Sequence, residues 1–153
     1  MKKFVAVLLA AMLCLSFAAC GGEKATDKTV DAAAMFKTLL TDVTYTDNAT
    51  ELDSSMAGVL LGGELPEGTE AHLAANDSAY LRCAVFACKE KDAAAAVKKL
   101  IQTYIDDSID AKYNVDEVAL LQNAKIHSMG NYVAVAVTSD TDNVNKVIDQ
   151  YFA

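Results

Sequence analysis

The only two histidines of the chain, His72 and His127, are the side chains best suited to bind a transition metal. Each lies in a segment with strand-like alternation, and the two segments belong to different predicted hairpins. The rings can therefore approach each other only if the hairpins are neighbours. A structural zinc site needs about four ligands, and no short spacing of His, Cys or Asp supplies the others. We expect ordinary strand positions, no metal site and no bound cofactor.

Segments rich in Asp, Asn, Ser and Thr do not predict a cation site or a catalytic site either. The segment Asp140–Asn145 opens like a calcium-binding loop, but Val144 and Asn145 stand where that loop requires an oxygen ligand and a glycine. Acidic residues also stabilise the positive end of a helix, so we predict that a helix begins here. A serine nucleophile would need a histidine and a strained glycine-rich turn, and no serine has that context. We therefore predict no catalytic residue.

The first 20 residues have the pattern of a secretion signal. Two lysines, Lys2 and Lys3, precede an almost entirely apolar run, and the small pair Ala18-Ala19 follows it. The apolar run of about 16 residues is shorter than the roughly 20 that a membrane-spanning helix needs. This segment is therefore predicted to be cleaved and not to remain in the bilayer.

Cys20 is the predicted site of lipid attachment. The order of small residues, Cys20 and then Gly21-Gly22 resembles the bacterial lipobox, although Phe17 occupies the place that usually holds leucine. In a lipobox, a diacylglyceryl group is attached to the thiol and the chain is cut just before the cysteine. Two acyl chains hold a protein at a membrane where a single chain binds only marginally.

Composition limits the partners of the mature chain. Cleavage before Cys20 leaves 134 residues, and removing two lysines leaves 11 basic residues against 21 acidic ones, a net charge of −10. Nucleic-acid binding needs a basic surface that displaces counterions, so that function is excluded. Anionic headgroups should also repel the domain, so the lipid, and not the protein surface, is expected to hold it at the membrane.

Two further cysteines, Cys83 and Cys88, fall in one strand-like run. Five residues of strand span roughly 16 Å, and an odd separation places side chains on opposite faces. A disulfide needs alpha carbons within about 7 Å. We therefore expect two free, mostly buried thiols.

Periodicity predicts the order of elements. We expect helices at 31–41 and 50–61, the second ended by Gly62-Gly63, with a short strand at 43–46 between them. A hairpin at 70–75 and 78–89 turns at Asn76-Asp77. A long helix capped by Asp92, a shorter helix capped by Asn114, a second hairpin at 124–128 and 132–138, and a final helix capped by Thr141 or Asp140 follow.

These elements predict an α+β fold. The expected architecture is one antiparallel sheet built from two β-hairpins plus a short strand, with helices packed mainly on one face. The predicted organisation is a lipoprotein signal peptide at 1–19, a tether at 20–28 and a single α+β domain at 29–153.

Several short motifs together resemble a known family. They are Thr38-Leu39-Leu40, the stretch Thr50–Asp53 with nearby Met56, and Gly130–Val133 before the last helix. Over about residues 29–152 the chain resembles a domain-of-unknown-function family of small Gram-positive bacterial lipoproteins. The resemblance implies a cell-surface lipoprotein, and it implies no activity, substrate or catalytic residue.

The sequence therefore predicts a membrane-anchored extracellular lipoprotein on the outer face of the bacterial cytoplasmic membrane. Its domain is expected to be a non-catalytic binding or interaction module for an unknown envelope protein or small ligand. The alternatives are an envelope enzyme, such as a hydrolase, with a dispersed site, and a small solute-capture accessory protein.

Overall fold

The computed structural model describes residues 28–111 and 114–153. The predicted signal peptide, Cys20 and all of the tether except Lys28 lie outside the described residues. Within the described part of the chain, no helix is both long enough and apolar enough to cross a membrane.

Five antiparallel strands form one sheet in the order β1-β2-β3-β5-β4. The hairpin of β2 and β3 pairs through β3 with β5, so the two predicted hairpins are neighbours, and the short strand β1 lies beside β2 at one edge. The strands are β1 (Thr50–Leu52), β2 (Glu70–Ala75), β3 (Leu81–Ala87), β4 (Lys125–Met129) and β5 (Tyr132–Ala136).

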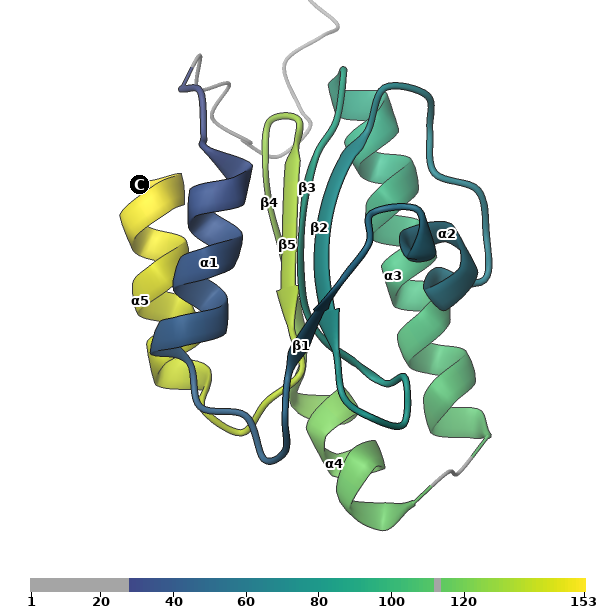
Figure 1. The fold of residues 1–153 in the computed structure, drawn as a ribbon. Helices are drawn as coiled ribbons and strands as arrows, with labels where there is room; N and C mark the ends of the chain where they lie inside the picture. The colour runs from purple at the N-terminus through teal and green to yellow at the C-terminus, as the bar shows by residue number, and fades with distance from the viewer. Residues whose placement is uncertain (1–27, 112–113) are drawn as a thin grey trace, which may run out of the picture.

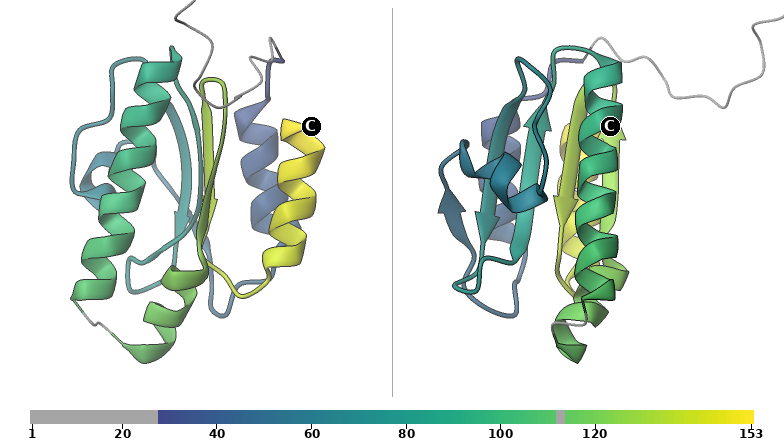
Figure 2. Two further views of the ribbon diagram at one scale, coloured as in Figure 1. Left: turned by 180° about the vertical axis from the view of Figure 1, so that it is seen from behind. Right: turned by 90° about the vertical axis from the view of Figure 1, so that its right-hand side faces the viewer.

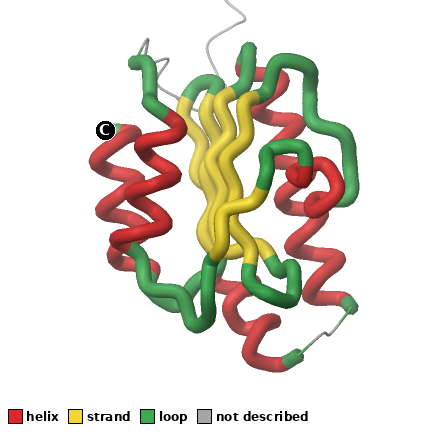
Figure 3. The backbone as a smooth tube through the Cα atoms, viewed as in Figure 1, coloured by secondary structure: helices red, strands yellow, loops and turns green. Residues whose placement is uncertain are grey.

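Helices cover both faces of the sheet (Figures 1 and 3). Three of the five described helices, including the longest, pack on one face: α2 (Met56–Leu61), α3 (Lys91–Asp110) and α4 (Val115–Asn123). The view from behind shows α1 (Ala32–Asp42) and α5 (Thr141–Phe152) side by side against the other face (Figure 2). The predicted α+β fold is confirmed, with most helical residues on one face and a second helical layer opposite.

The second helical layer follows from the central strands, which carry apolar side chains on both faces of the sheet. On one face of β3, Ala84 and Phe86 join a cluster with Val97 and Ile101 of α3. On the other face, Cys83 and Val85 join a cluster that is covered by residues of α1 and α5. Since a strand that is apolar on both sides must be buried on both sides, one helical layer cannot shield this sheet.

The two thiols lie as predicted. Cys83 and Cys88 are free and buried, and they belong to different core clusters on opposite faces of the sheet. Burial raises the pKa of the Cys83 thiol to about 11 and also raises that of Cys88. Both sulfurs therefore behave as small apolar groups in the core.

Side-chain caps define several helix ends. Asp31 Oδ1 accepts a hydrogen bond from the Ala34 N–H at 2.9 Å, and Asn114 Oδ1 accepts one from the Glu117 N–H at 2.9 Å. Gly62 ends α2 in the left-handed conformation, with φ +71°, as the Gly62-Gly63 prediction requires. The prediction for α3 was wrong by two positions: Glu90 is its N-cap, and Asp92 lies in its first turn.

Two predictions between α1 and β2 were wrong. Residues 43–46 form no strand, because the side chains of Asp140 and Thr138 hydrogen-bond the Thr44 N–H and C=O. Residues 50–61 are not one helix. Thr50–Leu52 instead pairs with Leu73–Ala75 as β1, and a turn in which Asp53 accepts from the Ser55 N–H separates it from α2.

Candidate functional site

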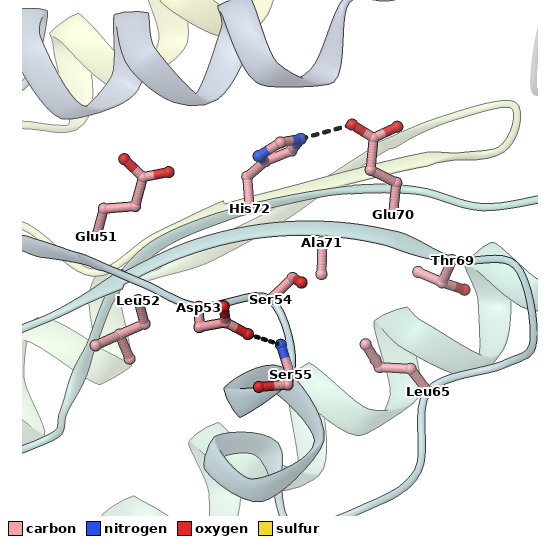
Figure 4. Close-up of a pocket in the computed structure, with 10 residues that line it drawn as sticks. All are labelled: Glu51, Leu52, Asp53, Ser54, Ser55, Leu65, Thr69, Glu70, Ala71 and His72. Carbon is pink, nitrogen blue, oxygen red and sulfur yellow. Dashed lines mark hydrogen bonds and ion pairs between the residues drawn. The ribbon is translucent and has the colours of Figure 1, made fainter.

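A recess of about 490 Å³ opens at the β1–β2 edge of the sheet (Figure 4). It exists because β1 is half the length of β2. The two strands pair only as far as Leu52 and Leu73, and the chain then turns away into α2. The first half of β2, Glu70–His72, is therefore left without a neighbour on that side.

The ladder geometry shows which backbone groups face this recess. At the ends of β3, the Arg82 C=O accepts from the Val137 N–H, and the Cys88 N–H donates to the Asn131 C=O. The backbone N–H and C=O groups of the even-numbered residues of β3 therefore point toward β5. In an antiparallel sheet these directions alternate along a strand. The odd residues of β3 therefore bond to Glu70, His72 and Ala74 of β2, and the intervening Ala71 points outward.

Ala71 thus presents its N–H and C=O to the recess. Its register partner on β3 is Phe86, whose own polar groups point toward β5. No residue in the described part of the chain hydrogen-bonds the Ala71 backbone from the open side. Ala71 is nevertheless only 6 % exposed. A nearly buried donor and acceptor without a protein partner are uncommon. The floor of the recess is therefore a candidate site for a ligand that hydrogen-bonds the Ala71 backbone.

Carboxylates and a histidine lie along the rim on the α1 side of the sheet. Figure 4 shows Glu51, Glu70 and His72 on the same side of the strands. The two glutamates are exposed, and Glu70 Oε1 lies 2.7 Å from His72 Nε2. The His72 ring stacks on Phe36 of α1, with ring centroids 5.8 Å apart. Packing and the Glu70 contact therefore hold the imidazole in one orientation.

The opposite side of the recess is mainly apolar with a polar end. Leu52, Leu65 and Ala71 form its apolar surface, while Ser54 and Ser55 lie at the turn that leads into α2. Asp53 at this turn accepts from the Ser55 N–H at 2.9 Å, and the hydrogen bond with Ser55 lowers the Asp53 pKa. The recess therefore combines an acidic rim, an apolar side and open backbone groups.

The recess brings together Ser54, Ser55, His72 and Glu70, which separately occur in hydrolase sites. Their arrangement does not form a nucleophile–base pair. Figure 4 shows the His72 ring on one side of β2 and both serines on the other. Among the described residues, no hydrogen bond joins either serine hydroxyl to His72. The described part of the chain contains no group of three or more His, Cys, Asp or Glu side chains that could hold a metal ion.

The two histidines do not share a site. His72 and His127 occupy one cross-strand row, His72–Val85–Ala134–His127. They are separated by three inter-strand spacings, about 14 Å at 4.8 Å each. Burial lowers the pKa of His127 and thus favours its neutral ring. Each histidine lies on a strand, as predicted, His72 on β2 and His127 on β4.

A helix begins within the segment Asp140–Asn145, as predicted. Asp140 Oδ2 accepts from the Thr44 N–H and from the Asn143 side chain, both at 2.9 Å, and α5 begins at Thr141. The hydrogen bond from the Thr44 backbone lowers the pKa of the Asp140 carboxyl. These contacts use the carboxylate to fix a loop at a helix start.

Sequence reasoning missed a buried ion network around Arg82 of β3. Its guanidinium binds both oxygens of Glu117 on α4 at 2.8 Å and both oxygens of Asp47 at 2.6 and 2.9 Å. Burial alone would lower the Arg82 pKa, but the hydrogen bonds to the two carboxylates outweigh it and raise the pKa. The hydrogen bond from Arg82 lowers the Asp47 pKa to about 2. The available signal was a single arginine in an otherwise apolar strand.

This network is structural. It ties β3 to α4 and to the loop before β1, and the Arg82 and Glu117 side chains are only 2 % and 6 % exposed. Asn76, at the β2–β3 turn, also donates to Asp47, at 2.6 Å. The network therefore fixes the end of the sheet from which β1 starts toward the recess.

Residues 70–138 match the family model described as Domain of unknown function (DUF4358). The matched segment runs from the start of β2 past the end of β5 and contains both hairpins. The predicted resemblance to a domain-of-unknown-function family is thereby confirmed. Comparisons with curated proteins and with solved structures find no match.

Proposed function

We propose that this chain is a membrane-anchored extracellular lipoprotein whose α+β domain is a non-catalytic binding module. Cys20 would carry the lipid, and the tether at 20–28 would hold the domain close over the outer face of the cytoplasmic membrane. The binding site would be the recess between β1 and β2.

One observation carries the binding role: the recess leaves a stretch of β2 unpaired beneath an acidic rim. It has the features of a recognition site, since apolar surface from Leu52 and Leu65 lies beside polar groups that can orient a ligand. The anchor rests on the lipobox-like sequence that ends at Cys20. A strongly acidic domain would gain little from the anionic membrane surface itself, which supports a lipid as the attachment.

The test is a thermal-shift screen of the full chain, purified from bacterial membranes in detergent, against peptides, sugars and cations. We expect a ligand that raises the unfolding temperature of the unmodified chain and does so less in a Glu51→Lys/Glu70→Lys variant. A Glu64→Lys/Glu67→Lys variant is the matched control, because these exposed glutamates lie in the neighbouring loop and do not line the recess.

Two results would contradict the proposal. A panel in which no compound stabilises the chain would argue against a binding module. Stabilisation that is identical in the rim and control variants would place the binding site elsewhere. Turnover of a generic ester or peptide substrate by the purified chain would instead favour the alternative, an envelope hydrolase with a dispersed site.

A larger recess of about 690 Å³ lies between α2, the β2–β3 turn and α3. Its apolar side includes Met56 and Leu60, and Val59 beside them is 74 % exposed. An apolar small solute is the ligand that such a surface fits best. Stabilisation by such a solute, unchanged in the Glu51→Lys/Glu70→Lys variant, would favour the alternative of a solute-capture accessory protein.

A further inference from the structure

We propose that the recess binds an extended peptide segment carrying lysine or arginine side chains, which continues the line of β1 and pairs with the backbone of Ala71. This inference rests on the proposed function and names the ligand class of the same site. The mode is strand addition at a sheet edge, in which main-chain hydrogen bonds hold the peptide and side chains give specificity.

The backbone geometry selects an extended peptide. The next position along β1 after Leu52 that would pair with Ala71 is Ser54, but the chain has already turned there, toward α2. The Ala71 N–H and C=O therefore point into the recess at the place where β1 would have continued. A strand bound there would give both groups the partners that they lack. The open stretch Glu70–His72 is three residues, about 10 Å of strand.

The charges select a basic peptide. Side chains of a strand alternate between the two faces of the sheet. In a peptide paired with Ala71, every second side chain would lie on the α1 face, near the carboxylates of Glu51 and Glu70. The intervening side chains would lie on the opposite face, against Leu52 and Leu65. The recess therefore fits an alternating basic–apolar sequence.

The other edge of the sheet does not share this preference. The outer strand β4 is unpaired along its outer side within the described part of the chain, but its five residues include Lys125 and no carboxylate. A basic peptide should therefore avoid β4, since like charges facing each other across a strand pair are destabilising.

The test uses three fluorescein-labelled octapeptides and the full chain in detergent, with binding followed by fluorescence anisotropy. The first peptide alternates lysine and valine, the second replaces each lysine by glutamate, and the third is the lysine peptide with its central amides N-methylated. The third keeps every charge, but its central residues cannot donate main-chain hydrogen bonds. It therefore separates strand pairing from simple attraction between a polycation and an acidic protein.

We expect the lysine peptide to bind and the glutamate peptide not to bind. N-methylation should weaken binding by about tenfold, because hydrogen bonds to the edge are lost. The Glu51→Gln/Glu70→Gln variant should weaken it by about five- to tenfold, as expected for exposed ion pairs. A Glu64→Gln/Glu67→Gln control should bind as the unmodified chain does. All four substitutions are at exposed positions, so the fold is not at risk.

Equal binding of the N-methylated and unmethylated peptides would overturn strand pairing. Unchanged binding in the Glu51→Gln/Glu70→Gln variant would overturn the role of the rim. Either result, if another compound still binds at the recess in the thermal-shift screen, leaves the proposed function standing. If the chain associates with itself and binds no peptide, the occupant of the β1–β2 edge is a second copy of the chain, and the proposal of a peptide ligand is overturned.

Discussion

Replacing Glu117 with glutamine should destabilise the fold strongly, because it removes one of the two carboxylates that balance a buried guanidinium. The Arg82 and Glu117 side chains are 2 % and 6 % exposed and share two hydrogen bonds of 2.8 Å. The glutamine amide keeps one acceptor oxygen, but its NH₂ group replaces the other and faces the N–H donors of the Arg82 guanidinium. Breaking a buried pair in this way costs about 3–5 kcal/mol.

The Asp47→Asn variant is the matched comparison within the same network. Asp47 also accepts two hydrogen bonds from Arg82, but its side chain is 41 % exposed. Solvent weakens a pair of this kind, so its loss should cost about 1 kcal/mol or less. Both variants remove one carboxylate from the same arginine, so their difference reports mainly the difference in burial, although Asp47→Asn also alters the hydrogen bond from Asn76.

The assay is urea unfolding of the full chain followed by far-UV circular dichroism. A double variant, Arg82→Met/Glu117→Met, should recover most of the loss, because an apolar pair of similar volume can replace a buried ion pair at little cost. The reasoning would be refuted if Glu117→Gln cost no more than Asp47→Asn. It would also be refuted if the double variant were less stable than Glu117→Gln alone.

Three further predictions follow from titration, lipidation and the thiols. Asp47 has a pKa of about 2 in the folded chain, held down by the hydrogen bond from Arg82, against about 3.9 when unfolded. Its stabilising effect is therefore complete above about pH 5 and is lost progressively as the pH falls toward 2. The Asp47→Asn variant should show a shallower acid-unfolding curve, and an unchanged curve would contradict this. Cys20→Ser should release the protein from bacterial membranes, as judged by fractionation, and full retention would argue against a lipid anchor. Alkylation of the denatured, unreduced chain should label both Cys83 and Cys88, whereas protection of both would indicate a disulfide.

Periodicity predicted most of the fold because most elements carry their own local signals. The two hairpins alternate clearly, and the predicted cap Asn114 hydrogen-bonds the first turn of its helix. The order of strands and the second helical layer depend on which surfaces meet. The double-sided apolar pattern of Leu81–Ala87 did contain a hint of that layer, since both alternations of the strand are buried.

The errors occurred where long-range contacts override local preference. The sequence of residues 50–61 favours a helix, but pairing with Leu73–Ala75 makes Thr50–Leu52 a strand. The candidate site depends on this pairing and on the turn at Asp53 that ends it. The recess could therefore not be predicted from the sequence. The ion network around Arg82 was missed for the same reason, since its two partners are each 35 residues away along the chain.

Hydrogen exchange at the Ala71 amide tests the central claim most directly. In the free chain, Ala71 should exchange much faster than His72, which pairs with Val85, and Leu73, which pairs with Leu52. Saturation with the lysine–valine peptide should slow exchange at Ala71 and leave the β4 amides unchanged. An Ala71 amide that is already protected in the free chain, or that stays unprotected in the saturated one, would contradict an open strand edge as the binding site.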